Sequence, residues 1–155
     1  MSDVPTRDRS VIGREFPPSY SVVEAEAVRR FARAIGETNA VFFDEATARA
    51  RGYRGLPIPP TYVFCLKHAE SSPDSALRAL GVEGGSGKLL HAEQAFEYLQ
   101  PICAGDRLCF RERIADVFEK KGGTLVFIVL ETRVTDDRDE TVAIIRHTEV
   151  IRSDV

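Results

Sequence analysis

The second half of this chain contains four extended segments of roughly ten or more residues, separated by short turn sequences. The segments cover residues 89–99, 107–118, 124–135 and 141–152. The connections PICAGD, EKKGG and DDRDE are rich in glycine, proline and charged residues, which is typical of turns. Long segments joined in this way predict four consecutive antiparallel strands, and the apolar face of such a sheet has to be covered.

The first half of the chain predicts an amphipathic helix that could cover a sheet. Ser21 and Glu24 have the spacing of a capping box, in which two side chains bond the free N–H groups at a helix start. Gly36 ends the pattern. Apolar residues recur on one helical face between these points: Val28, Phe31, Ala32 and Ile35.

Two more helices are expected before the strands. Asp44 can cap a short helix over residues 45–51, which Gly52 closes. A third helix starts at Pro59-Pro60-Thr61 and is apolar on nearly every side over residues 62–66, so other elements should surround it. We expect a polar loop over residues 71–87, with a helical turn at 74–80. With a further strand near residues 16–20, the sequence predicts an α+β hot-dog fold, an antiparallel sheet wrapped around a central apolar helix.

Length and composition narrow the class of protein. At 155 residues we expect a flexible N-terminus over residues 1–10 and a single domain over residues 11–155. The net charge of -3 and the absence of long basic or apolar runs argue against nucleic-acid and membrane partners. Three cysteines without CxxC spacing favour free thiols and no metal site: Cys65, Cys103 and Cys109. No secretory leader is visible, so we expect a cytoplasmic protein.

Two motifs carry a resemblance to a known family. The order of elements, the segment TNAVFFDEATARARGYRGLPIPPTY and the later motif PxxxGDxL resemble the MaoC-like hydratases and dehydratases. The second motif is formed here by Pro101, Gly105, Asp106 and Leu108. The resemblance is greatest to the fatty-acid-synthase-like N-terminal dehydratase branch, and it extends from Val11 onward.

The resemblance implies a catalytic site that is incomplete in this chain. Active members use a GDxNPxHxD segment, whose Asp and His activate water, followed by an HG motif whose backbone N–H binds the thioester carbonyl. Residues 36–44 occupy the first motif, where Glu37 replaces the Asp and Phe42 replaces the His. Pro59-Pro60 stands at the HG position, and proline has no backbone N–H. Phenylalanine cannot transfer a proton, so the pair of catalytic groups is broken.

We therefore separate candidate catalytic residues from candidate binding residues. Glu37 and His91 are the remaining catalytic candidates. Asn39 and Asp44 can contact substrate, but their side chains are better explained as ordinary turn and helix-cap residues. Nine residues are predicted to bind an acyl thioester: Asn39, Phe42, Phe43, Asp44, Tyr53, Pro57, Pro59, Pro60 and Tyr62.

The histidines allow a second interpretation. His91 and Glu93 lie two residues apart on one predicted strand, so they should share a face, opposite to the face that carries Gln94. Such a pair could be a base with its orienting carboxylate or a half-exposed surface pair. His68 and His147 are interpreted as a helix-end residue and a strand-surface residue.

Two functions therefore compete at this stage. In the first, the chain is the acyl-binding half of a two-part (R)-specific hydratase or dehydratase of fatty acid metabolism, paired with a subunit that carries the intact Asp and His. In the second, it is a self-sufficient homodimeric enoyl-thioester hydratase, or a thioesterase, that uses Glu37 or His91. Both functions require a CoA or acyl-carrier-protein thioester, need no cofactor, and predict a dimer formed through an exposed sheet edge.

Overall fold

The structure is a computed structural model that describes residues 9–68 and 89–152. The expected loop over residues 71–87, its helical turn and residues 1–8 of the expected flexible N-terminus lie outside the described residues. The helical elements are η1 (Arg9–Val11), α1 (Ala25–Ala34), η2 (Ala40–Phe42), α2 (Glu45–Ala50), α3 (Tyr62–His68) and η4 (Lys121–Gly123). The strands are β1 (Ser19–Val22), β2 (Leu89–Tyr98), β3 (Arg107–Lys120), β4 (Leu125–Thr135) and β5 (Thr141–Arg152).

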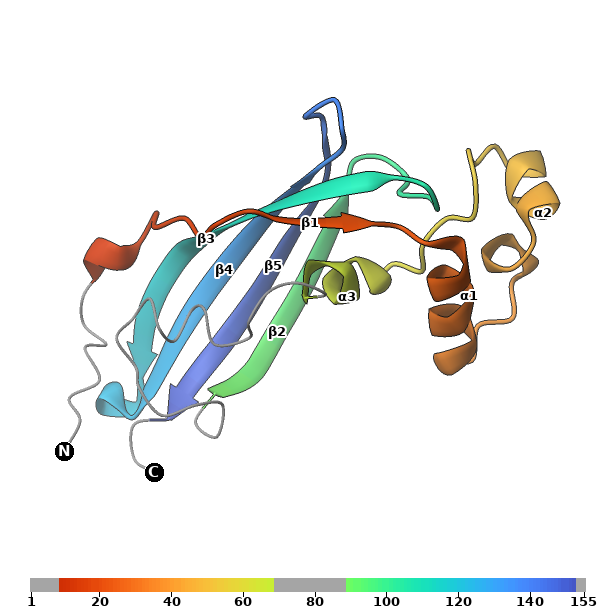
Figure 1. The fold of residues 1–155 in the computed structure, drawn as a ribbon. Helices are drawn as coiled ribbons and strands as arrows, with labels where there is room; N and C mark the ends of the chain where they lie inside the picture. The colour runs from red at the N-terminus through yellow and green to blue at the C-terminus, as the bar shows by residue number, and fades with distance from the viewer. Residues whose placement is uncertain (1–8, 69–88, 153–155) are drawn as a thin grey trace.

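The five strands form one antiparallel sheet in the order β1-β3-β4-β5-β2. The four long strands begin and end within two residues of their predicted positions, which confirms that part of the prediction. The chain crosses from β2 at one edge to β3 near the other, so β2 pairs only with β5 among the described strands. The sheet curls, and α3 lies across one of its faces (Figure 1).

The N-terminal strand begins later than expected, because two prolines precede it. It was predicted over residues 16–20, and β1 covers Ser19–Val22, opposite residues 107–110 of β3. Pro17 and Pro18 have no N–H for a strand ladder. Before them the chain bonds β3 without forming a strand: Gly13 N donates to Ile114 O at 2.8 Å, and Phe16 N donates to Glu112 O at 2.9 Å.

Of the expected helix caps, one is confirmed and one is wrong. Asp44 caps α2 by accepting a hydrogen bond from Thr47 N at 2.7 Å. The predicted capping box does not form, because Ser21 belongs to β1 and its hydroxyl donates to Leu66 O at 3.2 Å. Glu24 is the N-cap residue of α1 but makes no side-chain cap bond.

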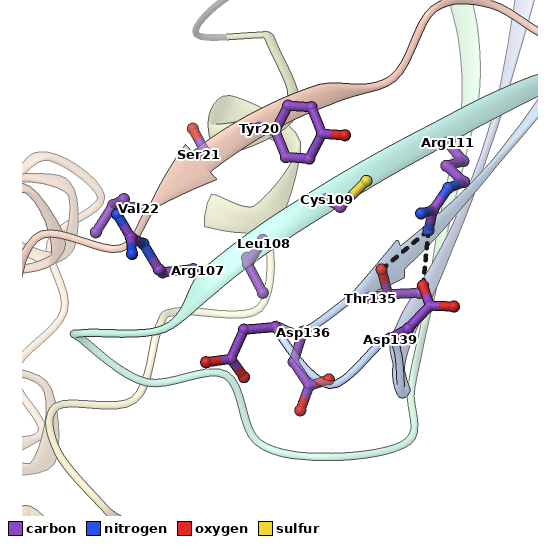
Figure 2. A pocket seen from close by; sticks show the side chains of 11 residues that line it. Tyr20, Ser21, Val22, Arg107, Leu108, Cys109, Arg111, Thr135, Asp136 and Asp139 are labelled. Atoms are coloured by element: carbon purple, nitrogen blue, oxygen red, sulfur yellow. Dashed lines mark hydrogen bonds and ion pairs between the residues drawn. The ribbon is translucent and has the colours of Figure 1, made fainter.

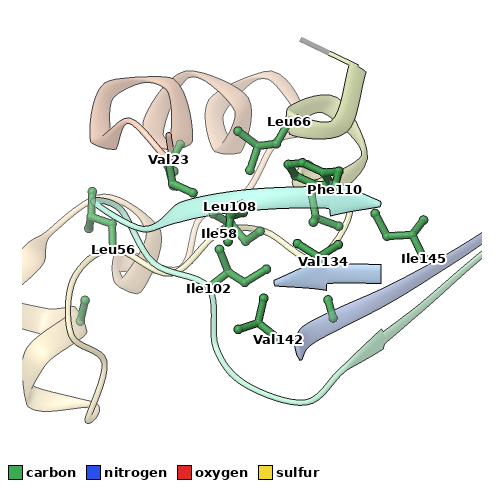
Figure 3. Close-up of a cluster of buried hydrophobic side chains, with 14 of the residues drawn as sticks. Val23, Leu56, Ile58, Leu66, Ile102, Leu108, Phe110, Val134, Val142 and Ile145 are labelled. Carbon is green, nitrogen blue, oxygen red and sulfur yellow. The ribbon is translucent and has the colours of Figure 1, made fainter. Parts of the chain in front are cut away.

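Helix α3 is covered mainly on its sheet side. Val63 and Leu66 are buried in a core cluster that β3, β4 and β5 complete (Figure 3). Cys65 is exposed, so the expectation of a fully surrounded helix is not met within one chain. The exposed side leaves a surface that a second subunit could cover.

Polar side chains divide the interior into two hydrophobic clusters. Along β3, Glu112 lies between Phe110 of one cluster and Ile114 of the other. We call the group formed by Lys67, Glu112, Thr132 and His147 the buried polar belt; it draws one residue from each of α3, β3, β4 and β5. The prediction that His147 lies on the strand surface is wrong, because its side chain is only 2% exposed.

Candidate functional site

The polar residues of the motif segment bond nearby backbone groups. The Glu37 carboxylate accepts hydrogen bonds from Thr38 N at 2.8 Å and Asn39 N at 2.9 Å. Asn39 Oδ1 accepts from Val41 N at 3.2 Å and caps η2. At Asp44, hydrogen bonds from Thr47 hold the pKa of the carboxyl below its ordinary value. These contacts give Glu37, Asn39 and Asp44 local structural roles.

The two phenylalanines of the segment point to different surroundings. Phe42 is half-buried, packs against the main core cluster and lines a cavity. Phe43 faces α1: its carbonyl accepts from Arg29 Nε at 3.0 Å, and its ring centre lies 6.0 Å from the guanidinium carbon of Arg33. Only Phe42 is therefore placed to touch a ligand in that cavity.

The cavity next to Phe42 has a volume of about 370 Å³ and lies between the motif loop and the end of β2. Four of the nine predicted binding residues line it: Phe42, Tyr53, Pro57 and Pro60. The rest of the lining includes a second segment that was not predicted: Tyr98, Leu99, Gln100, Pro101 and Ile102. An isolated antiparallel β-bridge between Pro57 and Cys103 joins the two segments. The local sequence pattern does not predict that pairing.

The two family motifs are tied together beside this cavity. Arg54 makes a two-point contact with Asp106, at 2.8 and 2.9 Å, and this hydrogen-bonded carboxylate raises the pKa of the guanidinium. Asp106 also accepts from Cys103 N at 2.9 Å. Gly55 passes close to the same turn, where an added Cβ would lie 3.2 Å from Ala104 O. The GYRG and PxxxGDxL sequences thus form one structural unit.

One phenol bridges the two sides of the cavity. Tyr98 Oη donates to Pro60 O at 2.6 Å, and burial raises the pKa of Tyr98, so the phenol keeps its proton near neutral pH. Ile58 N donates to Ile102 O and Tyr62 N donates to Pro59 O. Within residues 58–62, all of which the structure describes, only Thr61 has an N–H without a hydrogen bond.

Three further predicted binding residues lie away from the cavity lining. Tyr62 packs on Phe31, with ring centres 4.8 Å apart, and burial raises its pKa. Pro59 is buried at the start of α3, and Phe43 contacts α1 as described above. These three residues position the loop around the cavity.

The second catalytic candidate, His91, is separated from its predicted partner by a β-bulge. His91 opposes Glu149 on β5, whereas Glu93 opposes the adjacent residue, Thr148. Opposite residues share a face and adjacent residues alternate, so His91 and Glu93 lie on opposite faces. The bulge thereby puts His91 on the face of Gln94, contrary to the prediction. The His91 ring stacks on His147, with centres 5.8 Å apart.

Glu37 and His91 do not form one site. The hydrogen bonds of Glu37 go to its own turn, and the ring neighbours of His91 are Phe64 and His147. No contact between the two residues is found in the described part of the chain. The described part of the chain also contains no cluster of three histidine, cysteine or carboxylate side chains that could bind a metal.

A larger cavity, of about 620 Å³, lies on the other face of the sheet (Figure 2). Tyr20, Cys109 and Thr135 oppose one another across β1, β3 and β4, so they share the face turned away from α3. Arg111 closes one wall by donating to Thr135 Oγ1 at 3.2 Å and Asp139 Oδ1 at 3.0 Å. No predicted site residue lines this cavity, so the smaller one is the better candidate.

An antiparallel sheet curled over a helix, with an apolar cavity beside a dehydratase-like motif, defines the class of hot-dog dehydratases. The family described as the FAS1-like dehydratase domain region matches residues 10–145. A UPF0336 protein of Streptomyces griseus is 34% identical over 122 residues, which are 78% of this chain and 80% of that protein. A UPF0336 protein of Saccharopolyspora erythraea is 31% identical and covers 94% and 91%, respectively.

Solved structures agree with the family assignment. The HadBC (3R-hydroxyacyl-ACP dehydratase) complex of Mycobacterium tuberculosis contains a chain that is 27% identical, with a TM-score of 0.72 and coverage of 90% and 96%. A MaoC-like dehydratase is 26% identical with a TM-score of 0.77; this chain spans 43% of that protein. The chain belongs to the FAS1-like dehydratase family and has its hot-dog fold. Among the described residues, no helix is long and apolar enough to cross a membrane.

Proposed function

We propose that this chain is the acyl-binding, non-catalytic half of a two-part (R)-specific hydratase or dehydratase acting on enoyl- or 3-hydroxyacyl thioesters of CoA or acyl carrier protein. The observation that carries the proposal is the place of Phe42. It stands at the position of the family's histidine, and its ring lines the cavity. An apolar ring there can hold an acyl chain but cannot move a proton.

The chemistry of the reaction supports a non-catalytic role. Adding water to an enoyl thioester requires a base, an acid and a donor for the developing oxyanion. Glu37 is the remaining acid-base group at the two catalytic positions of the motif, and its carboxylate accepts hydrogen bonds from the backbone N–H groups of residues 38 and 39. Pro59 and Pro60 offer no N–H at the expected oxyanion position.

The cavity supports binding of an acyl or pantetheine arm. Its volume of about 370 Å³ lies in the range of small-molecule sites, and its lining is mostly aromatic and aliphatic. Tyr98 keeps a neutral phenol at the rim, and the Arg54–Asp106 contact fixes the loop that carries Tyr53 and Pro57. These features suit an uncharged chain better than a charged metabolite.

The missing catalytic groups would come from a partner subunit. The similar HadBC structure is a complex of two different subunits. Within residues 9–68 and 89–152, the long edge strand β2 has no neighbour on its outer side and Cys65 of α3 is exposed. A second hot-dog subunit could pair on these surfaces. A dimer is therefore part of the proposal.

Acyl-CoA binding without turnover is the direct test. We expect acyl-CoA thioesters to raise the melting temperature of the isolated chain, while crotonyl-CoA hydration stays far below about 1 per second, an ordinary enzyme rate. Phe42→Ala should weaken binding by about tenfold or more, because a ring that contacts the ligand is lost. Phe43→Ala is the matched control, because its ring lies outside the cavity.

Two outcomes would contradict the proposal. The absence of a thermal shift across acyl-CoA lengths and with an acyl carrier protein would exclude thioester binding. Rapid turnover by the chain alone would favour the self-sufficient homodimeric hydratase, or thioesterase, instead. In that case Glu37→Gln and His91→Ala should be compared for loss of activity at unchanged stability.

A further inference from the structure

The cavity on the face of the sheet turned away from α3 has no part in the proposed function. We call it the outer cavity; it is formed by β1, β3 and the turn after β4 (Figure 2). Its volume of about 620 Å³ falls within the range of small-molecule sites, roughly 300–1,000 Å³. The candidate acyl cavity lies beside the motif loop, so a ligand of the outer cavity would occupy a separate site.

One wall of the outer cavity is an apolar surface on β1. Tyr20 is 59% exposed and Val22 is 50% exposed, although both are large hydrophobic residues. Residues two apart on a strand share a face, so both side chains lie on the cavity side of β1. An aromatic or aliphatic ligand group would cover these two side chains and remove their apolar surface from water.

Most charged groups of the outer cavity are already bound within the chain. Arg111 donates to Thr135 and to Asp139, as described above. The Asp136 carboxylate accepts hydrogen bonds at 3.0 and 2.9 Å from two backbone N–H groups of its own turn. These contacts hold the turn after β4 in place, so the groups that make them serve to shape the cavity.

Two opposite charges of the lining remain unengaged. Arg107 and Asp137 are exposed, and neither side chain makes a hydrogen bond or ion pair with another described residue. Arg107 lies opposite Val22, on the β1 side of the cavity, and Asp137 lies in the turn between β4 and β5, on the other side of β3. An arginine attracts a carboxylate and an aspartate attracts an ammonium group. A cation and an anion on separate walls fit a ligand that carries both charges.

We propose that the outer cavity binds a small zwitterion with an aromatic side group, the class to which free aromatic amino acids belong. The ligand's carboxylate binds Arg107, its ammonium group binds Asp137, and its ring packs on Tyr20 and Val22. A ligand with a single charge leaves one of the two protein groups unmatched, so the site selects a zwitterion over an anion or a cation. The proposal goes beyond acyl binding, because it concerns the opposite face of the sheet.

Ligands that lack one charge test the site on the full chain. Phenylalanine is compared with phenylpropanoate, which lacks the ammonium group, and with phenylethylamine, which lacks the carboxylate. Titration of the isotope-labelled chain, followed by amide NMR, measures each affinity and locates each ligand. We expect phenylalanine to bind about tenfold tighter than either analogue, because each analogue loses one charge-assisted contact. The amide signals that move should belong to β1, β3 and the turn after β4.

Two variants assign each protein charge to its ligand group. Arg107→Gln should weaken phenylalanine binding about tenfold and leave phenylethylamine binding unchanged, because that amine has no carboxylate. Asp137→Asn should weaken phenylalanine binding and leave phenylpropanoate binding unchanged. Arg30→Gln is the matched control, because this exposed arginine of α1 lies outside the outer cavity, and it should change none of the three affinities.

Three outcomes would overturn the proposal: no binding of phenylalanine, equal affinities for the three ligands, or moving amide signals confined to other parts of the chain. A loss in Arg30→Gln equal to that in Arg107→Gln would also overturn it, because the effect would then be one of net charge. Acyl-CoA thermal shifts should be the same in Arg107→Gln, Asp137→Asn and the wild type. Their absence in the wild type overturns the proposed function and leaves the outer cavity unaffected.

Discussion

Two polar regions of the molecule contain similar side chains in opposite situations. In the motif turn, residues 36–44, the carboxylates of Glu37 and Asp44 lie near the surface and bond adjacent backbone N–H groups. In the buried polar belt, the ammonium of Lys67 reaches Glu112, whose carboxylate also accepts from Thr132 Oγ1 at 3.0 Å. The first region is held by local contacts, and the second by contacts between separate elements.

The two regions differ in what a charged side chain contributes to stability. Burial lowers the pKa of Lys67, and the neighbouring Glu112 opposes that shift, so each group of the pair depends on the other. Surface caps stabilise by small amounts, whereas a buried ion that loses its partner is costly. Charge in the interior thus fixes α3 on the sheet, and charge in the motif turn shapes a loop beside the cavity.

The largest effect is expected in the buried polar belt. Lys67→Met should lower the free energy of unfolding by about 3–5 kcal/mol, because it leaves Glu112 buried without its cation. Urea unfolding measures the change. The double variant Lys67→Met/Glu112→Met should regain most of the loss, since no unpaired charge remains. Equal losses in the single and double variants would show that packing, not charge, holds α3.

A smaller effect is expected at the rim of the cavity. Tyr98→Phe removes the hydrogen bond to Pro60 O and should cost about 1 kcal/mol of unfolding free energy. Tyr20→Phe is the matched control, because this tyrosine is an exposed residue on β1, and it should leave stability unchanged. If both variants melt like the wild type, the phenol does not join the two sides of the cavity.

The cap of α2 should contribute less, and its contribution should depend on pH. Asp44→Ala should lower the melting temperature by about 2–4 °C at neutral pH. The folded pKa of Asp44 lies below its unfolded value of 3.8, so the charge contributes above that pH and loses its contribution as pH falls through the folded pKa. The difference from wild type should therefore shrink in acid. Asp44→Asn, which keeps a capping oxygen, should show a weaker pH dependence.

The smallest effect is expected from restoring the motif. Glu37→Asp/Phe42→His supplies the acid-base groups, but the prolines at 59 and 60 still withhold a backbone donor. Loss of such a donor typically costs about 3 kcal/mol, or more than a hundredfold in rate. Crotonyl-CoA hydration should thus rise little until Pro59→His and Pro60→Gly are added. Substantial activity in the double variant would show that Thr61 N–H, or another donor, already serves the oxyanion.

The sequence by itself determined where the long strands lie and which residues occupy the motif segment. Strand alternation and turn residues act locally, so the four long strands appear where the pattern put them, and Asp44 caps α2 as its spacing predicts. The prediction that Phe42 stands where the resembling family has a histidine likewise needs the sequence alone. Four of the predicted binding residues reach the cavity, and three of them lie in the single loop between α2 and α3: Tyr53, Pro57 and Pro60.

Only the tertiary structure decided how distant segments combine. The bridge from Pro57 to Cys103 brings the end of β2 into the cavity, and the bulge after His91 moves that side chain to the opposite face. Burial of His147 depends on α3 lying over β5, which a single strand's alternation does not encode. Periodicity reports the two faces of one strand, whereas register, strand order and the choice of buried face follow from packing between elements far apart in the chain.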